Sequence, residues 1–508
     1  MADSAVVVIL VKTFQDGVCE GMVRHGYAVK RADNIFSSLP VMVVEGFGAS
    51  HAAEGHKQHP CDYLSQTRSH FRAAKIQNLQ NDCKKKYFCR MKKLNNPVMK
   101  QLPKVSNGFL FTLLLVVVMS FSATAQKKPY HGIQIPRHNF VDTVKIKIWD
   151  GAVIIPVEIN GQTRNLLFDT GAEHGFWIGE QEDWMTSSGD SITLYDVQNV
   201  SKKTVIMKIP PIKMGDVVIE NYPMMISSSL SDYVCDKIDG AFGYDLVVRG
   251  LSFKFDTKDS LMIVTDRKGF FSKEERRQPT LKYKWYHKSR PQIWVQFPFH
   301  RIKILFDSGA IGGGFDLRED LMQIWGDSDT ALRRKMDEYT VRKDTTVFST
   351  VGFWGRPTDT VPYRVFHCPE VEMGGITFTD VWVSTDNRTG KVGSSILEHN
   401  SLILDGYKRR LVLLPHDGKR VQHVGNEDTI GVKTLLADKS DTLGVLKVVV
   451  RKDGEAYKKG IRSGDYVESV NGVTITDYCT YLNIVSADKK AKRCVYRSPE
   501  GVRKEVEW

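Results

Sequence analysis

The amino-acid sequence predicts a mainly β protein with two similar halves followed by a small α+β module. Short alternating or apolar runs dominate the chain, and helical periodicity is confined to stretches such as residues 317–325 and 330–338. A short aspartate signature occurs twice, at residues 166–172 and 304–310, which lie 138 positions apart. Near the C-terminus, an Asn-Gly pair at residues 471–472 follows an apolar run, which is typical of a tight hairpin.

The similarity between the two halves extends beyond this signature. Residues 155–159 match residues 293–297 at the same offset, so a strand of alternating pattern precedes each aspartate. Further along, each half contains a Met-Gly pair, then a glycine after an apolar residue, then a strand that ends in Asp. An internal duplication is the economical interpretation. We define repeat 1 as residues 140–270 and repeat 2 as residues 280–416.

Two carboxylates in equivalent turns suit hydrolysis by an activated water molecule. Such a reaction needs a base for the water and an acid for the carbonyl oxygen and the leaving amine. Two carboxyl groups held about 3 Å apart share one proton, supply both roles and titrate as a pair. Asp169 and Asp307 are therefore the candidate catalytic residues. The residues that follow each aspartate are expected to support the pair. The hydroxyl groups of Thr170 and Ser308 can form hydrogen bonds across the interface, and Gly171 and Gly309 allow close backbone approach. Ala172 and Ala310 complete the two signatures.

The residue after each glycine bears on the working pH. Ala172 and Ala310 stand where a hydroxyl side chain could have donated a hydrogen bond to the carboxylate and stabilised its charged form. Without that donor, the pair of carboxyl groups is expected to be less acidic. The sequence therefore predicts a mildly acidic to near-neutral optimum.

With these motifs, residues 140–416 resemble the aspartic proteases, specifically two retropepsin-like or pepsin-like lobes fused in tandem. In that family each lobe supplies one Asp-Thr/Ser-Gly, and a later apolar-apolar-Gly strand passes beside it in a psi-shaped crossing. The resemblance assigns Gly243 and Gly393 to these crossings. It implies two closed, barrel-like lobes related by a pseudo-twofold axis. It also implies endopeptidase activity on a peptide or protein substrate, without a metal or organic cofactor.

Aspartic proteases cover their substrate with hairpin flaps, and each repeat contains a candidate. These are the polar run at residues 196–203 and the segment 349–357, in which Phe353 and Trp354 lie between glycines. An aromatic pair suits a mobile lid, and packing against a neighbouring loop explains it equally well. His174 lies on the loop after the first signature, where a lone histidine is more often solvated, and is left outside the site.

Other interpretations of the same residues remain open. A single Asp-Gly after an apolar strand is most often an ordinary turn, because Asp caps its own backbone and Gly accepts positive φ. A protease fold that has lost activity would serve as a peptide-binding protein. Carboxyl groups about 3 Å apart favour catalysis, whereas splayed lobes or a side chain that fills the cleft favour binding.

Residues 427–508 form a separate module that resembles a PDZ domain, because Gly-Asp-x-Val precedes Val-Asn-Gly within residues 464–472. The resemblance places a candidate peptide-binding loop, departing from the usual Gly-Leu-Gly-Phe, at Leu443, Gly444, Val445 and Leu446. Addition of a peptide strand to the edge of the sheet is physically available to such a module. We expect it to recruit substrate or to regulate access, and both roles remain open.

The N-terminal part contains a secretory signal in an unusual place. A short basic stretch, an apolar run at 109–121 and small residues at 123–125 predict a signal peptide at residues 99–125, cleaved before Gln126. Residues 1–98 are then expected to be an over-extended gene model, with an uncleaved signal anchor or a genuine cytoplasmic head as alternatives. The expected product is periplasmic or secreted, with no stable membrane anchor once the signal is removed.

Charge and cysteine content agree with this division. Most of the formal net charge of +12 comes from residues 1–125, and no basic stripe interleaved with aromatics occurs in the repeats, so no nucleic-acid partner is expected. The cysteines after the signal are too scattered for a disulfide framework or a metal site. Two of them share the C-terminal module and are candidates to pair, Cys479 and Cys494.

Overall fold

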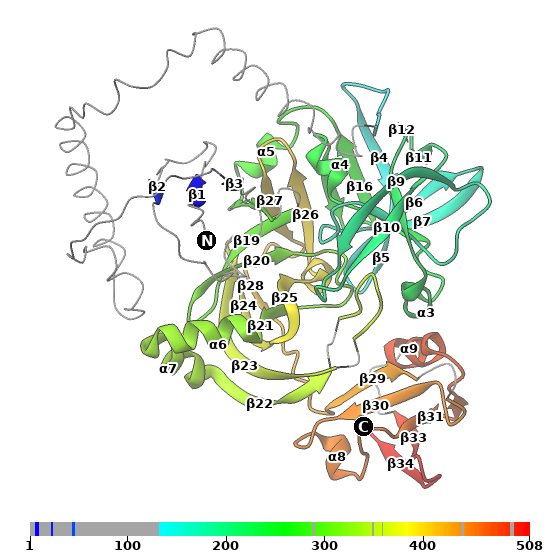
Figure 1. The fold of residues 1–508 in the computed structure, drawn as a ribbon, viewed down its shortest axis with the longest axis vertical. Coiled ribbons are helices and arrows are strands. Elements are labelled where there is room, and N and C mark those ends of the chain that lie inside the picture. Colours follow the sequence, from blue (N-terminus) through cyan, green and yellow to red (C-terminus); the bar gives the residue numbers. More distant parts are fainter. Residues whose placement is uncertain are drawn as a thin grey trace, which may run out of the picture. The chain divides into compact units, whose positions relative to one another are not determined.

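The computed structural model describes most of the chain after residue 131 and three short strands before it (Figure 1). The described residues are 132–508 without 287–289, 348–349, 358, 438–440 and 488–491, together with β1 (Val6–Ile9), β2 (Met22–Val23) and β3 (Val43–Glu45). These three strands form a small sheet within a unit that spans Met1–Ala123. The predicted signal peptide and most of the predicted N-terminal extension lie outside the described residues.

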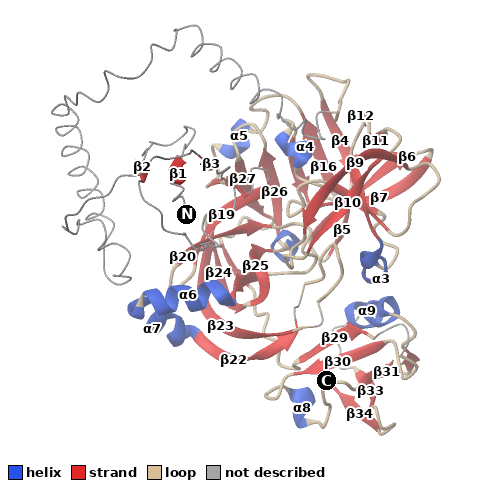
Figure 2. Ribbon diagram, viewed as in Figure 1, coloured by secondary structure: helices blue, strands red, loops and turns tan. Residues whose placement is uncertain are grey.

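The second unit, Thr124–Trp508, is mainly β, as the sequence predicts (Figure 2). Four sheets make up its framework. The two helical stretches expected from periodicity are present as α6 (Glu319–Ser328) and α7 (Thr330–Tyr339). The remaining helices before the C-terminal module are single turns, namely η3 (Ser228–Leu230), α3 (Ser231–Val234), α4 (Asp245–Val248), α5 (Ser272–Glu275) and η4 (Ser394–Glu398). No helix among the described residues is long and apolar enough to cross a bilayer.

Repeat 1 is built on a sheet with the strand order β12-β11-β6-β7-β14-β8-β13-β10-β9, in which β5 also pairs with β6. Its strands are β5 (Lys147–Trp149), β6 (Ala152–Ile159), β7 (Gln162–Phe168), β8 (Gly175–Ile178), β9 (Thr186–Tyr195), β10 (Ser201–Lys208), β11 (Ile212–Met214), β12 (Val217–Ile219), β13 (Met224–Ser227) and β14 (Gly240–Phe242).

Repeat 2 is built on a sheet with the order β18-β19-β20-β25-β21-β24-β23-β22, in which β28 also pairs with β24. Its strands are β18 (Lys284–Tyr286), β19 (Arg290–Gln296), β20 (Arg301–Phe306), β21 (Phe315–Arg318), β22 (Thr340–Val347), β23 (Thr360–Met373), β24 (Ile376–Ser384), β25 (Asp386–Val392) and β28 (Val421–His423).

The two sheets share one topology. The path β6-β7-β14-β8-β13-β10-β9 corresponds strand for strand to β19-β20-β25-β21-β24-β23-β22. The directions match as well: β7 and β14 are parallel, β14 and β8 antiparallel, and β8 and β13 parallel, and the counterparts in repeat 2 follow the same pattern. The internal duplication read from the sequence is therefore present in the fold.

A third sheet joins the repeats, with the order β17-β27-β26-β15-β16-β4. The junction is the antiparallel pair β15–β26, which takes one strand from each repeat. The strands of this shared sheet are β4 (Val141–Lys145), β15 (Ser252–Asp256), β16 (Leu261–Thr265), β17 (Leu281–Lys282), β26 (Asn400–Asp405) and β27 (Arg410–Pro415).

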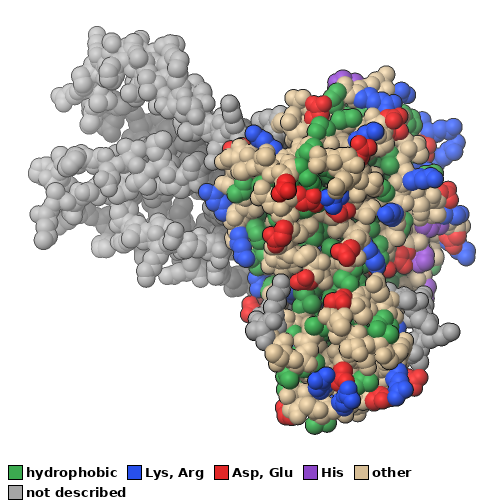
Figure 3. Space-filling view, turned by 90° about the vertical axis from the view of Figure 1, so that its right-hand side faces the viewer, with side chains coloured by type: hydrophobic (Ala, Val, Ile, Leu, Met, Phe, Trp, Pro, Cys, Tyr) green, Lys and Arg blue, Asp and Glu red, His purple; other side chains and the backbone are tan. Residues whose placement is uncertain are grey.

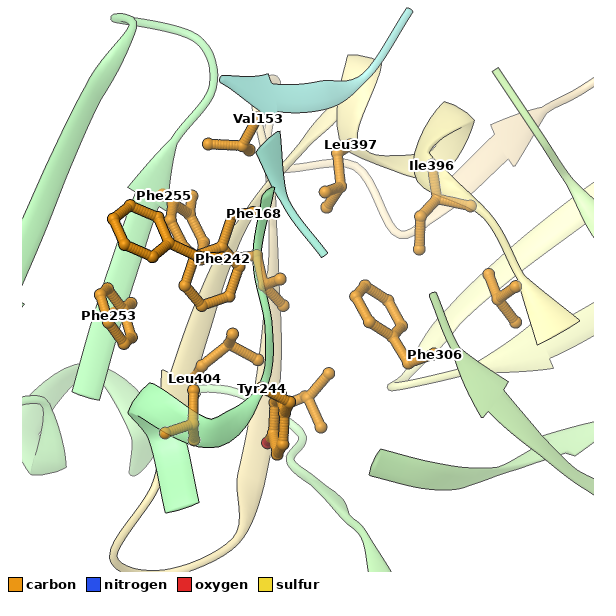
Figure 4. Close-up of a cluster of buried hydrophobic side chains, with 14 of the residues drawn as sticks. Val153, Phe168, Phe242, Tyr244, Phe253, Phe255, Phe306, Ile396, Leu397 and Leu404 are labelled. Atoms are coloured by element: carbon orange, nitrogen blue, oxygen red, sulfur yellow. The ribbon is translucent and has the colours of Figure 1, made fainter. Parts of the chain in front are cut away.

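Buried phenylalanines pack the shared sheet against the strands that carry the aspartate signatures (Figure 4). The ring of Phe168, the residue before Asp169, lies 4.8 Å from that of Phe253 and 4.7 Å from that of Phe255. Its counterpart Phe306, before Asp307, is also fully buried. Each such side chain contributes about 1.5–3 kcal/mol through burial, so the strand ends that position the two aspartates are firmly anchored.

The C-terminal module has its own sheet, with the order β29-β30-β31-β33-β34 and β32 beside β31, and its own apolar core. The predicted hairpin is present: Asn471 and Gly472 both have positive φ, and Val470 pairs with Val473 across the turn. The elements are β29 (Val432–Leu436), β30 (Leu446–Val450), α8 (Glu455–Lys458), β31 (Tyr466–Val470), β32 (Val473–Thr474), α9 (Tyr478–Ala487), β33 (Arg493–Arg497) and β34 (Arg503–Glu507).

The cysteine pairing differs from the one considered from sequence. Cys479 on α9 forms a disulfide with Cys235, which ends α3 of repeat 1, whereas Cys494 is a free, buried thiol. The pair forms because α3 and α9 pack together, and the rings of Tyr233 and Tyr478 meet edge to face at 5.2 Å beside it.

On the face of this unit drawn in Figure 3, basic and acidic side chains are interspersed.

Candidate active site

Each candidate aspartate lies at the end of the strand that carries its signature. Asp169 follows β7, and its backbone N–H donates to the carbonyl oxygen of Phe242 at 2.9 Å. Asp307 follows β20, and its N–H donates to the carbonyl oxygen of Val392 at 2.8 Å. The parallel neighbours β14 and β25 therefore fix the backbone of both aspartates in the same way.

The two turns are locked together by reciprocal hydrogen bonds. The hydroxyl of Thr170 donates to the carbonyl oxygen of Phe306 at 2.6 Å and accepts from the N–H of Ser308 at 2.9 Å. The hydroxyl of Ser308 donates to the carbonyl oxygen of Phe168 at 2.6 Å and accepts from the N–H of Thr170 at 3.1 Å. Both side chains are buried, so these four bonds hold the repeats in one relative position at the two aspartates. We call the pair Asp169 and Asp307 the dyad.

The glycines that follow are required by contact between the turns. A Cβ atom on Gly171 would lie 2.3 Å from Oδ1 of Asp307, and a Cβ atom on Gly309 would lie 2.4 Å from Oδ1 of Asp169. Each carboxyl group therefore rests on the glycine of the opposite turn. No residue with a side chain fits at either position without displacing the other repeat's aspartate.

The two carboxyl groups interact directly, and one of them holds its proton strongly. Burial, the neighbouring Asp307 and a hydrogen bond to it raise the pKa of Asp169 to about 8, although the N–H groups of Gly171 and Ala172 donate to its Oδ1 at 2.7 and 3.0 Å. Burial also raises the pKa of Asp307, but the charges of Lys391 and Arg290 and a hydrogen bond from Asp169 act in the opposite direction. The pair is therefore asymmetric, with the proton favoured on Asp169.

This asymmetry predicts a pH-dependent stability. A carboxyl group whose pKa is raised on folding stabilises the native state below its ordinary pKa and loses that contribution as pH rises towards the raised value. We therefore expect the melting temperature of the wild type to fall between about pH 4 and pH 8 relative to Asp169→Asn, with both proteins similar at pH 4. Thermal melts from pH 4 to 9 measure the difference, and parallel profiles would contradict it.

The reciprocal hydrogen bonds predict a large effect on stability. Thr170→Val keeps the shape of the side chain but leaves the buried carbonyl of Phe306 and the N–H of Ser308 without their partner. At about 1–3 kcal/mol for each unsatisfied group, we expect a loss of roughly 2–6 kcal/mol in the free energy of unfolding. Urea titration measures it. Thr193→Val on the exposed face of β9 is the matched control, and an equal loss there would contradict the assignment.

The two crossing glycines predicted from the resemblance lie where backbone segments touch. A Cβ atom on Gly243 would come within 2.6 Å of the backbone of His174, and one on Gly393 within 2.4 Å of the carbonyl oxygen of Gly313. In repeat 2, the N–H of Gly393 donates to the carbonyl oxygen of Gly314 at 2.8 Å. The run of glycines at 312–314 therefore lies in close backbone contact with the second crossing.

His174 is buried, in contrast to the solvated position expected for a loop histidine. Its Nδ1 lies 3.6 Å from Oδ2 of Asp245, and Oδ1 of Asp245 accepts from the hydroxyl of Tyr222, which in turn accepts from the N–H of Gly243. The side chain thus belongs to a polar cluster that supports the first crossing.

The two candidate flaps are the tips of equivalent hairpins. Tip loop 1, residues 196–200, joins β9 to β10, and tip loop 2, of which residues 350–357 and 359 are described, joins β22 to β23. The two tips touch each other: the side chain of Gln198 donates to the carbonyl oxygen of Thr350 at 2.5 Å, and the N–H of Trp354 reaches Oδ2 of Asp196 at 3.3 Å. In the described structure the hairpins therefore meet.

Tip loop 2 also carries an aromatic side chain into repeat 1. Phe353 is 9% exposed and meets the ring of Phe176 edge to face at 5.6 Å, and its carbonyl oxygen accepts from the hydroxyl of Ser227 at 2.6 Å. The same apolar cluster contains Ala172 and Ile311, which follow the two aspartate turns. Phe353 and Trp354 therefore pack in the same apolar cluster as the residues that follow the two aspartate turns.

The C-terminal module contacts tip loop 2 from outside the repeats. The guanidinium of Arg356 donates to the carbonyl oxygen of Thr434 on β29 at 2.7 Å. Lys433 on the same strand forms an ion pair with buried Asp386 and reaches the carbonyl oxygen of Val347 at 3.4 Å. Among the described residues β29 is an outer strand of its sheet. These contacts therefore lie at or beside the edge to which a peptide strand could add.

The candidate peptide-binding loop lies at another place in the module. The residues from Leu443 to Val445 belong to the connection between β29 and β30, and Leu446 begins β30, which has strands on both sides. Leu446 is fully buried and Leu443 is 38% exposed. The candidate loop therefore leads into a central strand, β30. The outer strand, to which a peptide could add, is β29.

Sequence reasoning did not single out the charged groups around Asp307. Lys391 lies two residues before the second crossing glycine, Gly393, is 1% exposed and pairs with Asp316 at 3.0 Å. Arg290 donates from Nη1 to the carbonyl oxygen of Gly171 at 3.0 Å and so bridges the repeats. One signal in the sequence could have identified Lys391. When the two repeats are aligned at Gly243 and Gly393, this lysine takes the position of the apolar Ala241.

No protein-family model and no curated protein matches this chain.

Proposed function

We propose that the chain is an exported aspartic endopeptidase, in which Asp169 and Asp307 hydrolyse peptide bonds with an activated water molecule. The observation that carries the proposal is the meeting of the two turns through the reciprocal bonds of Thr170 and Ser308, with the carboxyl groups in contact. A turn that only caps its own strand does not require a partner turn 138 residues away. Two acidic groups in contact, with their pKa values pushed apart, suit an acid and a base.

The asymmetry of the pair supports one assignment of the two catalytic roles. Asp169 keeps its proton to about pH 8 and is the general acid, and Asp307, offset by the charges of Lys391 and Arg290, is the general base. Asp307 takes a proton from the water as its oxygen bonds to the peptide carbon, while Asp169 protonates the carbonyl oxygen. When the C–N bond breaks, Asp307 returns its proton to the leaving amine and Asp169 recovers the proton from the hydroxyl.

The fold supports this proposal at the level of the lobes. Identical strand order in the two repeats, one shared sheet and a dyad with one member from each repeat are what two acid-protease lobes related by a pseudo-twofold axis require. The backbone contacts at Gly243 and Gly393 suit the two psi crossings.

We infer that the C-terminal module, on its resemblance to PDZ domains, regulates access to the dyad. Tip loop 2 lies over the approach to the dyad, and Arg356 of this loop is bound to Thr434 of the module. Lys433 of the module bonds to Val347, where β22 leads into the loop, and pairs with Asp386 on β25. Because the loop has to move before a peptide can enter, contacts that bind its closed position oppose entry. A peptide that adds to β29 would compete for the carbonyl that Arg356 uses.

Export is part of the proposal. The disulfide between Cys235 and Cys479 suits an oxidising compartment, and the predicted signal peptide provides a route to one. Both features agree with a periplasmic or secreted enzyme.

A peptide-binding protein without hydrolytic activity is the alternative. It is favoured by Phe353, which fills the apolar approach to the dyad in the described structure. Against it, Phe353 belongs to a hairpin tip rather than to the sheet, so its removal does not require the repeats to unfold.

Incubation of the oxidised full-length protein with a mixed peptide library from pH 3 to pH 8, with cleavage read by mass spectrometry, tests the proposed function. We expect cleavage at internal peptide bonds with an optimum between mildly acidic and neutral pH. A folded protein that binds peptides in this range without cutting any of them would establish the alternative.

A further inference from the structure

The duplicated fold allows the two sides of the dyad to be compared position by position. In repeat 1, Ala241 on β14 lies opposite Phe176 on β8. In repeat 2, Lys391 on β25 occupies the matching position and lies opposite Asp316 on β21. The same structural position thus carries an apolar pair in one repeat and a charged pair in the other.

Both pairs lie on the face of their sheet that borders the dyad. Ala241 and Phe176 belong to the apolar cluster that includes Ala172 and Ile311, from the two aspartate turns. The next residues along the strands, Phe242 and Val392, point the other way into the main core. Since side chains alternate along a strand, Lys391 faces the same side in repeat 2 as Ala241 does in repeat 1.

Lys391 contacts both the neighbouring strand β21 and tip loop 2. Its ammonium group is 3.0 Å from Oδ2 of Asp316 and donates to the hydroxyl oxygen of Thr350 at 2.8 Å. Its charge also acts on Asp307. A buried ammonium is costly, and an apolar side chain would serve packing at least as well, as Ala241 does in the other repeat.

The closed tip loop indicates what each side can accept. Phe353 fills the apolar side against Phe176, and Thr350 presents an oxygen atom to Lys391 on the charged side. An ammonium has three donors, of which Asp316 and Thr350 use two. When tip loop 2 leaves, Thr350 leaves with it and a desolvated cationic donor faces the entering peptide.

We propose that Lys391, held by Asp316, selects an acidic side chain, Asp or Glu, at a substrate position next to the scissile bond, and that the pocket of Ala241 and Phe176 takes an apolar side chain on the other side. This inference rests on the proposed function. The shared proton leaves the dyad with one negative charge, which Lys391 and Arg290 offset, so an acidic side chain is not excluded by the aspartates.

Matched peptides test the selection. Each peptide has one Phe beside the central bond and Glu, Gln, Leu or Lys on the other side, in both orders, and is assayed at pH 6.5, where Glu is ionised. For the wild type we expect kcat/KM to be about tenfold higher with Glu than with Leu, equivalent to about 1.4 kcal/mol. Higher values with Leu or Lys, or equal values with Glu and Gln, would overturn the proposal.

Variants assign the preference to Lys391. Lys391→Met retains most of the length of the side chain without its charge, and is expected to lose the preference for Glu and to favour Leu. Asp316→Asn leaves the cation without its paired charge and is expected to increase the preference for Glu, which provides a second readout if Lys391→Met folds poorly. Unchanged ratios in a folded Lys391→Met protein would overturn the assignment.

Binding measurements separate this inference from the proposed function. The full-length Asp169→Asn protein is titrated into fluorescein-labelled versions of the same peptides, and anisotropy gives Kd for each. A lower Kd for the Glu peptide than for the Leu peptide supports the role of Lys391 even if the wild type cleaves nothing. Cleavage by the wild type with no difference between Glu and Leu would leave the proposed function standing and overturn this inference.

Discussion

Asparagine in place of either Asp169 or Asp307 is expected to abolish peptide hydrolysis, with kcat lowered by at least about 10³-fold. Each substitution keeps the size of the side chain but removes the shared proton, so the acid and the base are lost together. Because the two residues act as one unit, the double variant is expected to be no slower than either single variant. Initial rates with a fluorogenic peptide, measured near the optimal pH, provide the comparison.

The matched control for these variants is Asp190→Asn, which removes the same charge from an exposed position on β9. It is expected to retain wild-type rates. Thermal melts separate lost chemistry from lost structure. The asparagine variant of Asp169 is expected to be no less stable than the wild type near neutral pH, because the folded wild type must keep a proton on Asp169 that the unfolded chain releases. If only one of the two aspartates proved necessary, a shared dyad would be excluded.

The elements around the aspartates were predictable because each one is encoded locally. Apolar strands that run into Asp-Thr/Ser-Gly, the Met-Gly turns and the later crossing glycines recur in the same order, and one topology repeats with them. The hairpin at Asn471-Gly472 was predictable for the same reason, since positive φ at two successive positions favours those residues.

The groups that tune the site were less accessible to sequence reasoning because they depend on contacts between distant segments. The disulfide joins Cys235 to Cys479 across a sequence separation of 244, and nothing near either residue indicates its partner. Lys391 reads as an ordinary charged residue until the strand register sets it beside Asp316 and under Thr350. The meeting of the two hairpin tips is likewise a property of the assembled repeats.

The second large effect is expected at this disulfide. Cys235→Ser and Cys479→Ser each release the tether that joins α9 of the C-terminal module to α3 of repeat 1. The module then holds tip loop 2 only through non-covalent contacts such as that of Arg356 with Thr434, at a lower effective concentration. If the closed loop limits entry, a tenfold larger open fraction raises kcat/KM about tenfold. Steady-state kinetics with and without a reductant measure this effect.

The control is Cys494→Ser, which alters a buried free thiol of the same module and leaves the disulfide intact. Reductant is expected to raise kcat/KM of the wild type and of this control, whereas the Cys235 and Cys479 variants are expected to have the raised value without reductant and to be insensitive to it. In the chain-entropy model the disulfide contributes about 5 kcal/mol to stability, so the assays require melting curves at the same temperature. A fall in kcat/KM in folded variants would instead mean that the tethered module delivers substrate. If the tether only held tip loop 2 closed, its removal would not lower kcat/KM.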